Sequence, residues 1–360
     1  MKTYIKFLVG LFLKSFANIM LIAFSLVIIL NLLSELDFFK GMAIKTYFPI
    51  FLSILNSPTL IFEMFPFIFL LSTQLFFISL LNNNEISIFK YSGLKNSKIL
   101  IIISIVSFVL GFLIITLFYN FSSNLKNLYL ELKSNYTKDG KYLAVITKNG
   151  LWIRDKIEDT TFIINASKIE NEFLIDNFIT EFNQDYEVIR NIRSEKIDIK
   201  NKKWLIYNPT IYTDSNYKEN QENEEIIIET NFDYERIQSL FSNLSSLSLF
   251  ELIKLRDNYK TLNYSTTEVN IHLLKLFLYP IYMVLMTILS GIIMLKIRKY
   301  ESSTFKISFG LFLSVIIYYI NNFSNILGKV EKIPMSLSVL MPLFLLMMIN
   351  GMMVYKINDE

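Results

Sequence analysis

The chain has 360 residues, 52% of them hydrophobic, and a mean hydropathy of +0.41, which is typical of a membrane protein and not of a soluble helical domain. Its formal net charge is only +3, and no basic stripe with interleaved aromatic residues occurs, so nucleic-acid binding is excluded. Because the chain has no cysteine, it forms neither disulfides nor thiolate metal sites.

Six apolar stretches each reach or exceed the roughly 20 residues that span the hydrocarbon core of a bilayer. They are Phe7 to Leu33, Phe48 to Leu81, Ile99 to Phe121, Ile271 to Leu295, Phe305 to Leu327 and Pro334 to Tyr355. The first has no small-residue cleavage site, so we expect it to remain as an anchor. Three stretches precede and three follow the polar segment 122–270. This order predicts a polytopic α-helical membrane protein with six transmembrane helices and an inserted domain.

The short loops predict the orientation, because loops rich in Lys and Arg resist translocation. Segment 82–98 carries three lysines against Glu85, and segment 296–306 carries four basic residues against Glu301. We therefore expect both segments and both termini in the cytoplasm, with the polar segment on the other side of the membrane.

The polar segment 122–270 differs from the remaining chain in charge and in hydrophobic period. It carries 19 Lys and Arg against 24 Asp and Glu, net −5, whereas the remaining chain carries 16 against 8, net +8. Strands are expected at Tyr142 to Thr147, Leu151 to Arg154, Thr161 to Ile164, Phe173 to Phe182, Tyr186 to Ile192, Trp204 to Thr213 and Glu225 to Phe232. Such short alternating strands predict an all-β domain, an antiparallel sandwich or jelly roll, with a mobile loop at Asp214 to Glu225.

The expected domains follow from these elements. Residues 1–121 hold transmembrane helices 1–3, 122–238 the jelly-roll domain, 239–270 a connecting helical segment, and 271–360 transmembrane helices 4–6. The connecting helix is expected at Ser239 to Lys260, with Ser248 as its N-cap. Residues 82–94 are expected to form a short cytoplasmic amphipathic helix with an Asn-rich N-cap, Glu85 in its first turn and Gly93 at its end. Such a helix can dock into a groove of a soluble partner.

The chain shows no sign of catalytic chemistry of its own. It has no GxxxxGK[ST] loop and no GxSxG elbow, and its one histidine, His272, cannot build an HExxH or three-histidine site. We therefore expect a non-enzyme that holds no metal or cofactor and takes its energy from a partner or an ion gradient.

Two ionisable residues inside the spans, Lys14 and Glu63, leave room for an ion-coupled secondary transporter of a lipid or other amphiphile. They are expected near opposite faces of the membrane, which argues against a charge pair, and Lys14 can snorkel to the interface. A membrane-bound glycosyl- or acyltransferase would need a compact group of carboxylates or histidines at an interface, and the sequence offers none. A mechanotransmitting permease would carry its large outer domain after one span, whereas here the domain follows three.

Several local motifs resemble those of a known family in their order and spacing. They are Leu33-Ser34-Glu35-Leu36-Asp37, Glu85 with Gly93, Gly150-Leu151-Trp152-Ile153-Arg154-Asp155, Lys275 with Pro280, and Leu327-Gly328 followed by Pro334 and Pro342. With the spans and the strand domain, nearly the whole chain resembles the bacterial inner-membrane permeases of lipopolysaccharide export, the LptF/LptG (YjgP/YjgQ) type. The resemblance implies a bacterial inner-membrane protein whose inserted strand domain is a periplasmic jelly roll. The first and third motifs lean towards the LptG subunit.

The resemblance implies the partners and the energy source. It implies a heterodimer with an LptF-type sister permease, seated on a cytoplasmic LptB-type ATPase dimer that binds ATP and Mg. Lipopolysaccharide would then pass to a single-span periplasmic bridge protein of the LptC type and to a periplasmic LptA-type protein. The first and fifth spans would form lateral gates around a central cavity.

The resemblance also implies roles for individual residues. Glu85 and Gly93 belong to the helix that couples to the ATPase, where the carboxylate makes a charge-assisted contact. Lys40 and Lys45, with Asp37, lie near the outer end of the first span, where the family binds lipid phosphates. Trp152 belongs to the path of the acyl chains.

Overall fold

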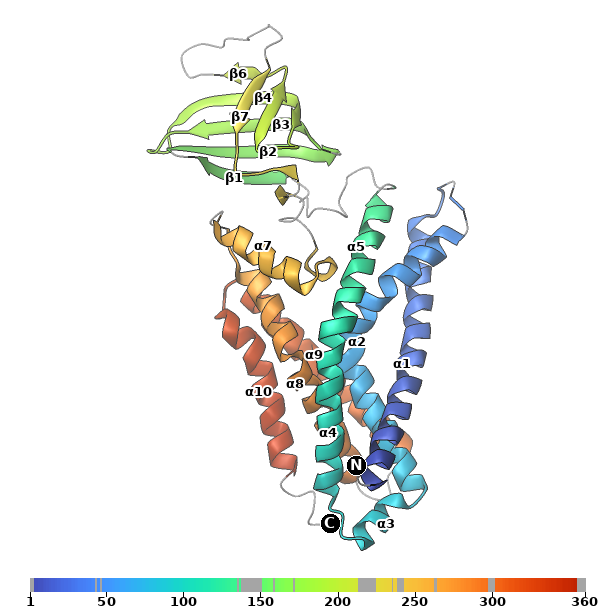
Figure 1. Cartoon of the computed structure of the whole chain (residues 1–360). Coiled ribbons are helices and arrows are strands. Elements are labelled where there is room, and N and C mark those ends of the chain that lie inside the picture. The colour runs from blue at the N-terminus through green and yellow to red at the C-terminus, as the bar shows by residue number, and fades with distance from the viewer. Residues whose placement is uncertain are drawn as a thin grey trace. The chain divides into compact units, whose positions relative to one another are not determined.

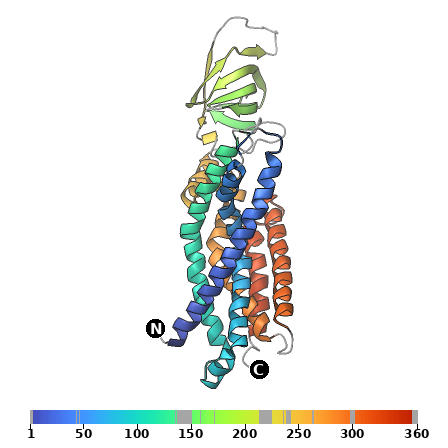
Figure 2. The same cartoon turned by 90° about the vertical axis from the view of Figure 1, so that its right-hand side faces the viewer.

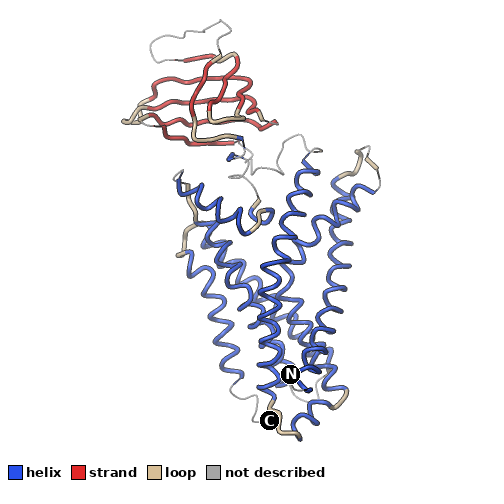
Figure 3. Tube along the Cα trace, viewed as in Figure 1, coloured by secondary structure: helices blue, strands red, loops and turns tan. Residues whose placement is uncertain are grey.

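The computed structural model describes residues 3–42, 44–45, 47–134, 136, 151–157, 159–170, 172–212, 225–234, 236–237, 243–261, 264–296 and 302–354. The chain divides into a helical unit, Met1–Lys126 with Ser265–Glu360, and a second unit, Asn127–Tyr264, which we call the β unit. Figure 3 shows the strands gathered in the β unit.

Six helical spans are long and apolar enough to cross a membrane, which confirms the predicted apolar helices (Figure 1). They are α1 Thr3–Phe38, α2 Tyr47–Asn82, the composite helix α4 Asn96–Leu113, η1 Ile114–Tyr119 and α5 Asn120–Ser134, then α8 Thr267–Lys296, α9 Ser303–Lys329 and α10 Met335–Val354. The first five contain their predicted stretches. The sixth begins one residue after Pro334, and Tyr355 lies outside the described residues.

Helix α2 continues through Pro58 and Pro66, although proline lacks the N–H that a helix requires at each position. Pro66 leaves the carbonyl of Phe62, four residues earlier, without its helical donor. The hydroxyl of Tyr279 on α8 donates to this carbonyl. A neighbouring helix thus satisfies the freed backbone group, which is how membrane helices tolerate proline.

Helix α8 is the most buried span, and its neighbours approach it at small residues. A Cβ on Gly111 of α4 would lie 2.9 Å from the Cα of Pro280, and a Cβ on Gly291 would lie 2.2 Å from a methyl carbon of Leu100. Between these two contacts the hydroxyls of Ser107 and Thr287 lie 2.9 Å apart and share a hydrogen bond. Close approach of backbones is the main source of helix association in lipid, so α4 and α8 form a tight pair.

Helix α9 turns small or polar residues towards the protein. Its buried residues are Lys306, Gly310, Ser314, Ser324, Asn325 and Gly328. Near its start, Gln74 Nε2 of α2 donates to the Lys306 carbonyl (2.9 Å), and Lys306 Nζ donates to the Met294 carbonyl of α8 (3.4 Å). The large apolar residues of α9, such as Phe312 and Phe323, are exposed on the chain, as expected of a helix that faces lipid or another subunit.

The β unit contains one curled antiparallel sheet (Figures 1 and 2). Its strands are β1 Leu151–Ile157, β2 Thr160–Glu170, β3 Phe173–Phe182, β4 Val188–Asp198, β5 Lys203–Tyr207, β6 Thr210–Tyr212 and β7 Ile226–Glu229. The order is β1-β2-β3-β4-β5-β7, and β6 also pairs with β4. Helix α7, Leu249–Thr261, follows the strands.

The core of the β unit is built on one row of isoleucines across five strands. Paired positions in β1, β2, β3, β4 and β6 are Ile153, Ile164, Ile179, Ile192 and Ile211. The first four are no more than 2% exposed. Side chains on one face of a sheet recur every second residue. The residues of these strands that lie two positions from this row are therefore also on the inner face.

The structure corrects the prediction of one strand at Trp204 to Thr213. It is divided into β5 and β6, which pair with separate parts of β4. Asn208 between them has a left-handed φ of 46°, and Pro209 has no N–H to donate, so pairing is interrupted.

The connecting helix begins later than predicted. Residues 244–246 form a short 3-10 helix, and α7 starts at Leu249. Ser248 and Glu251 form a capping box, in which Ser248 N–H donates to Glu251 Oε2 (2.7 Å) and Glu251 N–H to Ser248 Oγ (3.4 Å). The predicted N-cap is therefore confirmed. The predicted strand 142–147 and nearly all of the predicted loop 214–225 lie outside the described residues.

The tight crossing of α4 and α8 yields a stability prediction. Gly111→Val should lower the free energy of unfolding by about 1–3 kcal/mol, because the added carbons meet the Pro280 backbone. Thermal unfolding in detergent measures this loss. Gly10→Val on α1 is the matched control, since no heavy atom lies within 4 Å of a Cβ at that position. Equal melting temperatures for the two variants would contradict the prediction.

Candidate functional site

The short helix α3, Glu85–Tyr91, lies where the sequence predicts it. Gly93 follows it with a φ of +80°, its N–H donates to the Lys90 carbonyl (3.0 Å), and Leu94 N–H donates to the Phe89 carbonyl (2.9 Å). This Schellman arrangement requires a left-handed residue, so Gly93 ends α3 as predicted. An Asn, Asn84, holds the N-cap position as predicted, but it has a φ of 56° and its side chain makes no capping bond.

One side of α3 packs against the helical unit, and the other is open. Ile86 and Phe89 pack against the core, with the Phe89 ring 6.2 Å from that of Phe7 on α1. The open side carries Ile88, 60% exposed, and Tyr91, 92% exposed. Sequence reasoning did not single out these two residues. The signal that could have found them is their spacing of three within a polar loop, since this spacing places them together on a helix.

Glu85 itself is half-buried in the first turn of α3. Its Oε2 atom is shielded from solvent and has no hydrogen-bond partner among the described residues. A carboxylate oxygen in this condition calls for a donor, because an unsatisfied buried acceptor is costly. Figures 1 and 2 show α3 at the same end of the helical unit as both ends of the described chain.

The three predicted lipid-binding residues lie around the connection between α1 and α2. Asp37 is in the last turn of α1, Lys40 follows its end, and Lys45 precedes α2, and all three side chains are exposed. The Lys45 ammonium lies 5.9 Å from the centre of the Tyr47 ring. This connection is at the end of the helical unit opposite α3 (Figure 1). The two lysines thus offer positive charge at one end of the first span.

A chain of buried polar side chains links α1, α2 and α5. Asn31 Nδ2 donates to the Ser53 carbonyl (3.0 Å), and Asn56 Nδ2 donates to Asn31 Oδ1 (3.0 Å). Lys126 Nζ in turn donates to Asn56 Oδ1 (2.6 Å). Sequence reasoning missed this network, because isolated Asn residues in apolar stretches do not reveal which helices they join.

The polar residues that the sequence did single out are separated. Lys14 is exposed on α1 and Glu63 is exposed on α2, and no ion pair joins these two described residues. The structure therefore does not bring Lys14 and Glu63 together. His272 of α8 is hydrogen-bonded through Nε2 to the Tyr119 hydroxyl (3.0 Å), at the end of the π-helix η1.

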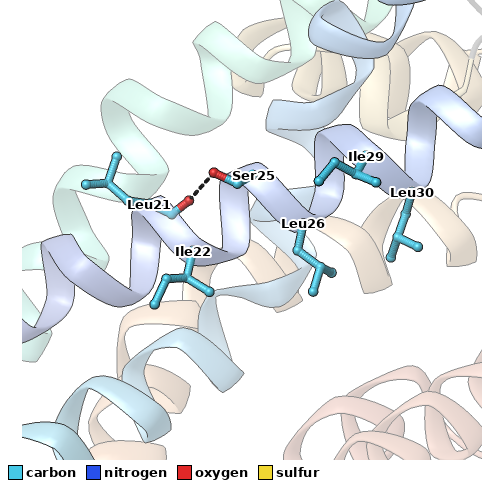
Figure 4. Close-up of a pocket in the computed structure, with 6 residues that line it drawn as sticks. All are labelled: Leu21, Ile22, Ser25, Leu26, Ile29 and Leu30. Atoms are coloured by element: carbon cyan, nitrogen blue, oxygen red, sulfur yellow. Dashed lines mark hydrogen bonds between the residues drawn. The ribbon is translucent and has the colours of Figure 1, made fainter.

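An apolar hollow of about 590 Å³ lies along the exposed face of α1 (Figure 4). Its lining residues are Leu21, Ile22, Ser25, Leu26, Ile29 and Leu30. The Ser25 hydroxyl donates to the Leu21 carbonyl of its own helix (2.9 Å), so it adds little polarity to the surface. Such a surface suits the acyl chains of a lipid or another apolar helix.

Trp152 of β1 lies on the face of the sheet opposite the isoleucine row. It is 54% exposed, and it shares a cross-strand row with Asn165, Phe178 and Arg193. The acyl-path role of Trp152 stays a prediction. The structure shows that its indole belongs to the outer face of the strand.

Together, the six apolar spans and the inserted strand sheet define a multi-pass membrane protein. A family model described as lipopolysaccharide export system permease LptF/LptG matches residues 6–356. The chain belongs to this family, and it is a transport subunit of lipopolysaccharide export and not a member of a catalytic family. No curated protein matches the chain.

The buried polar chain yields a prediction for the helical unit. Asn56→Ala removes the acceptor of Lys126 and the donor to Asn31, and should lower the free energy of unfolding by about 1–2 kcal/mol. Denaturation in mixed detergent micelles measures the change. Asn322→Ala, at an exposed position of α9, is the control and should be neutral. A neutral Asn56→Ala would show that the network adds no stability.

Proposed function

We propose that the chain is one of two sister permeases of an ABC-type exporter, which a separate cytoplasmic ATPase powers. In this arrangement the termini and α3 face the cytoplasm and the β unit faces the periplasm. The match over residues 6–356 carries the proposal. The basic loops beside α3 and between α8 and α9 support the orientation.

Helix α3 is the proposed contact with the ATPase. Ile88 and Tyr91 offer an apolar anchor on its open side, and Glu85 offers a carboxylate whose Oε2 lacks a hydrogen-bond donor. Buried aromatic anchors dominate the binding energy of many interfaces. Because Phe89 packs against Phe7, a push on α3 would reach the start of α1 directly.

Lipopolysaccharide is the proposed cargo, and α1 is its proposed first contact. The hollow along Leu21 to Leu30 suits acyl chains, and Lys40 and Lys45 suit the lipid phosphates. The β unit would then receive the acyl chains and pass them to a periplasmic bridge protein. Its apolar inner face supports this step, because such a face can shield the chains from water.

Purification of the chain from its native membrane in mild detergent tests the proposal. Mass spectrometry of the purified material should find a second LptF/LptG-type permease, an ATPase and lipopolysaccharide. A homo-oligomer without an ATPase would overturn it and favour an ion-coupled transporter.

The α3 contact yields a mutational prediction. Glu85→Ala and Tyr91→Ala should each leave the chain in the membrane but reduce recovery of the ATPase about tenfold, because each removes a central contact. Tyr47→Ala is the matched control, since Tyr47 is an exposed tyrosine near the other end of the helical unit. Unchanged ATPase recovery in both α3 variants would rule out this docking site.

A further inference from the structure

The outer edge of β1 is covered by side chains in place of a strand. Arg154 N–H donates to the Tyr264 hydroxyl (3.2 Å), and the Lys156 carbonyl accepts from Asn231 Nδ2 (3.1 Å). Residues 154 and 156 are two apart, so their backbone groups point to the same side of the strand, away from β2. No strand pairing joins β1 to β7 within the described part of the sheet.

Asp155 joins the two edges of the sheet at this point. The residue is 2% exposed, its Oδ2 accepts from Asn231 N–H (2.9 Å), and its Oδ1 accepts from Asn231 Nδ2 (2.8 Å). Asn231 follows the last residue of β7, Glu229, by two positions. The first and last strands of the path are thus held together by two hydrogen bonds to one carboxylate, which we call the edge latch.

The segment that follows Asn231 connects the edge latch to the rest of the β unit. Trp204 Nε1 of β5 donates to the Phe232 carbonyl (2.9 Å), and Arg236 donates to the Asn231 carbonyl (3.0 Å). Arg236 also donates to Thr261 Oγ1, at the end of α7 (2.8 Å). The position of Asn231 therefore depends on both β5 and α7.

Tyr264 connects the same edge to the start of the fourth span. It precedes the first residue of α8, Thr267, by three positions, and its ring meets Phe232 edge-on at 6.5 Å. Burial raises the pKa of the Tyr264 hydroxyl, so the group stays protonated across the physiological range and can accept from Arg154. A displacement of the chain at the start of α8 would therefore pull on the backbone of β1.

The isoleucine row lies in the covered interior of the β unit. Ile153, Ile164, Ile179 and Ile192 are already covered by the chain's own atoms. Entry of a chain would require two strands to separate. Adjacent strands β1 to β5 are joined by backbone ladders, whereas β1 and β7 are joined through side chains, so the least costly opening is between β1 and β7.

We propose that Asp155 and Asn231, with Tyr264 beside them, form a releasable latch between β1 and β7, and that its release exposes the isoleucine-lined interior to a lipid acyl chain. The choice of an acyl chain as the ligand rests on the proposed lipid transport. The opening of the sheet between β1 and β7 concerns the β unit alone. Asp155 is a positioning residue, since it acts through Asn231 and does not itself meet the lipid.

A reversible crosslink tests the latch in the full permease complex with lipopolysaccharide in membrane vesicles. Asp155→Cys with Asn231→Cys introduces the chain's only thiols, because the natural sequence has none. Oxidation with copper phenanthroline should close the pair and stop lipid transfer, and dithiothreitol should restore it, while ATP hydrolysis continues. The unsubstituted complex, treated in the same way, is the control. Transfer at the unsubstituted rate with the crosslink closed would overturn the proposal.

Hydrogen exchange tests the opening between β1 and β7 without any lipid. It also decides whether the latch exists if the crosslink does not close. Asp155→Ala should speed exchange of β1 amides about tenfold relative to β3, because two bonds to a carboxylate are lost. The control is Arg190→Gln, which removes a partner of Glu181 between the adjacent strands β3 and β4. Unchanged β1 exchange in Asp155→Ala would overturn the latch. If the unsubstituted complex transfers no lipid but β1 exchange rises, the proposed function fails and the latch stands.

Discussion

The helical unit depends on one constraint, which is that apolar helices in lipid gain nothing from burying apolar surface against one another. Association must come from close packing and from hydrogen bonds. Helix α8 collects both kinds of contact. Gly111 and Gly291 mark its closest approaches to α4, Ser290 Oγ donates to the Leu70 carbonyl of α2 (2.7 Å), and Asn350 Nδ2 of α10 donates to the Leu285 carbonyl (2.9 Å). The fourth span is therefore the axis around which the other spans are arranged.

The spans differ in how firmly they are held to this axis, and the difference agrees with a transport role. Helices α2 and α8 are largely buried, whereas α1 and α9 expose most of their large apolar residues. Helix α1 is held near its C-terminal end by the Asn31 and Asn56 bonds, and α9 is held near its start by Gln74. A permease needs peripheral helices of this kind, because a bulky lipid must pass beside them without dismantling the core. The hollow on α1 lies on such a surface.

The β unit solves a related problem in water. Its sheet buries an apolar row that is suited to acyl chains, and it protects the β1 edge with the side chains of Tyr264 and Asn231. Covered edges prevent uncontrolled strand pairing. Side-chain bonds between the edges can also be broken and remade without loss of a backbone ladder, which makes this edge the natural place for opening.

The sequence alone determined the elements whose signals are local. Six apolar stretches, the alternation in β1 to β4, the Gly93 stop of α3 and the Ser248 cap all arise from neighbouring residues, and the structure confirms them. The motifs in their order were also enough to indicate the family, which the match over residues 6–356 establishes.

The tertiary structure alone decided which distant residues meet. Asp155 and Asn231 are 76 positions apart, and Asn56 and Lys126 are 70 apart. Tyr279 of α8 donates to the Phe62 carbonyl of α2, which Pro66 of α2 leaves without its helical donor. The break between β5 and β6 has a local cause in Asn208 and Pro209, whereas the sheet alone decided which part of β4 each strand pairs with. Side-chain hydrogen bonds carry no periodicity, so their partners are set by packing and cannot be deduced from the pattern of one chain.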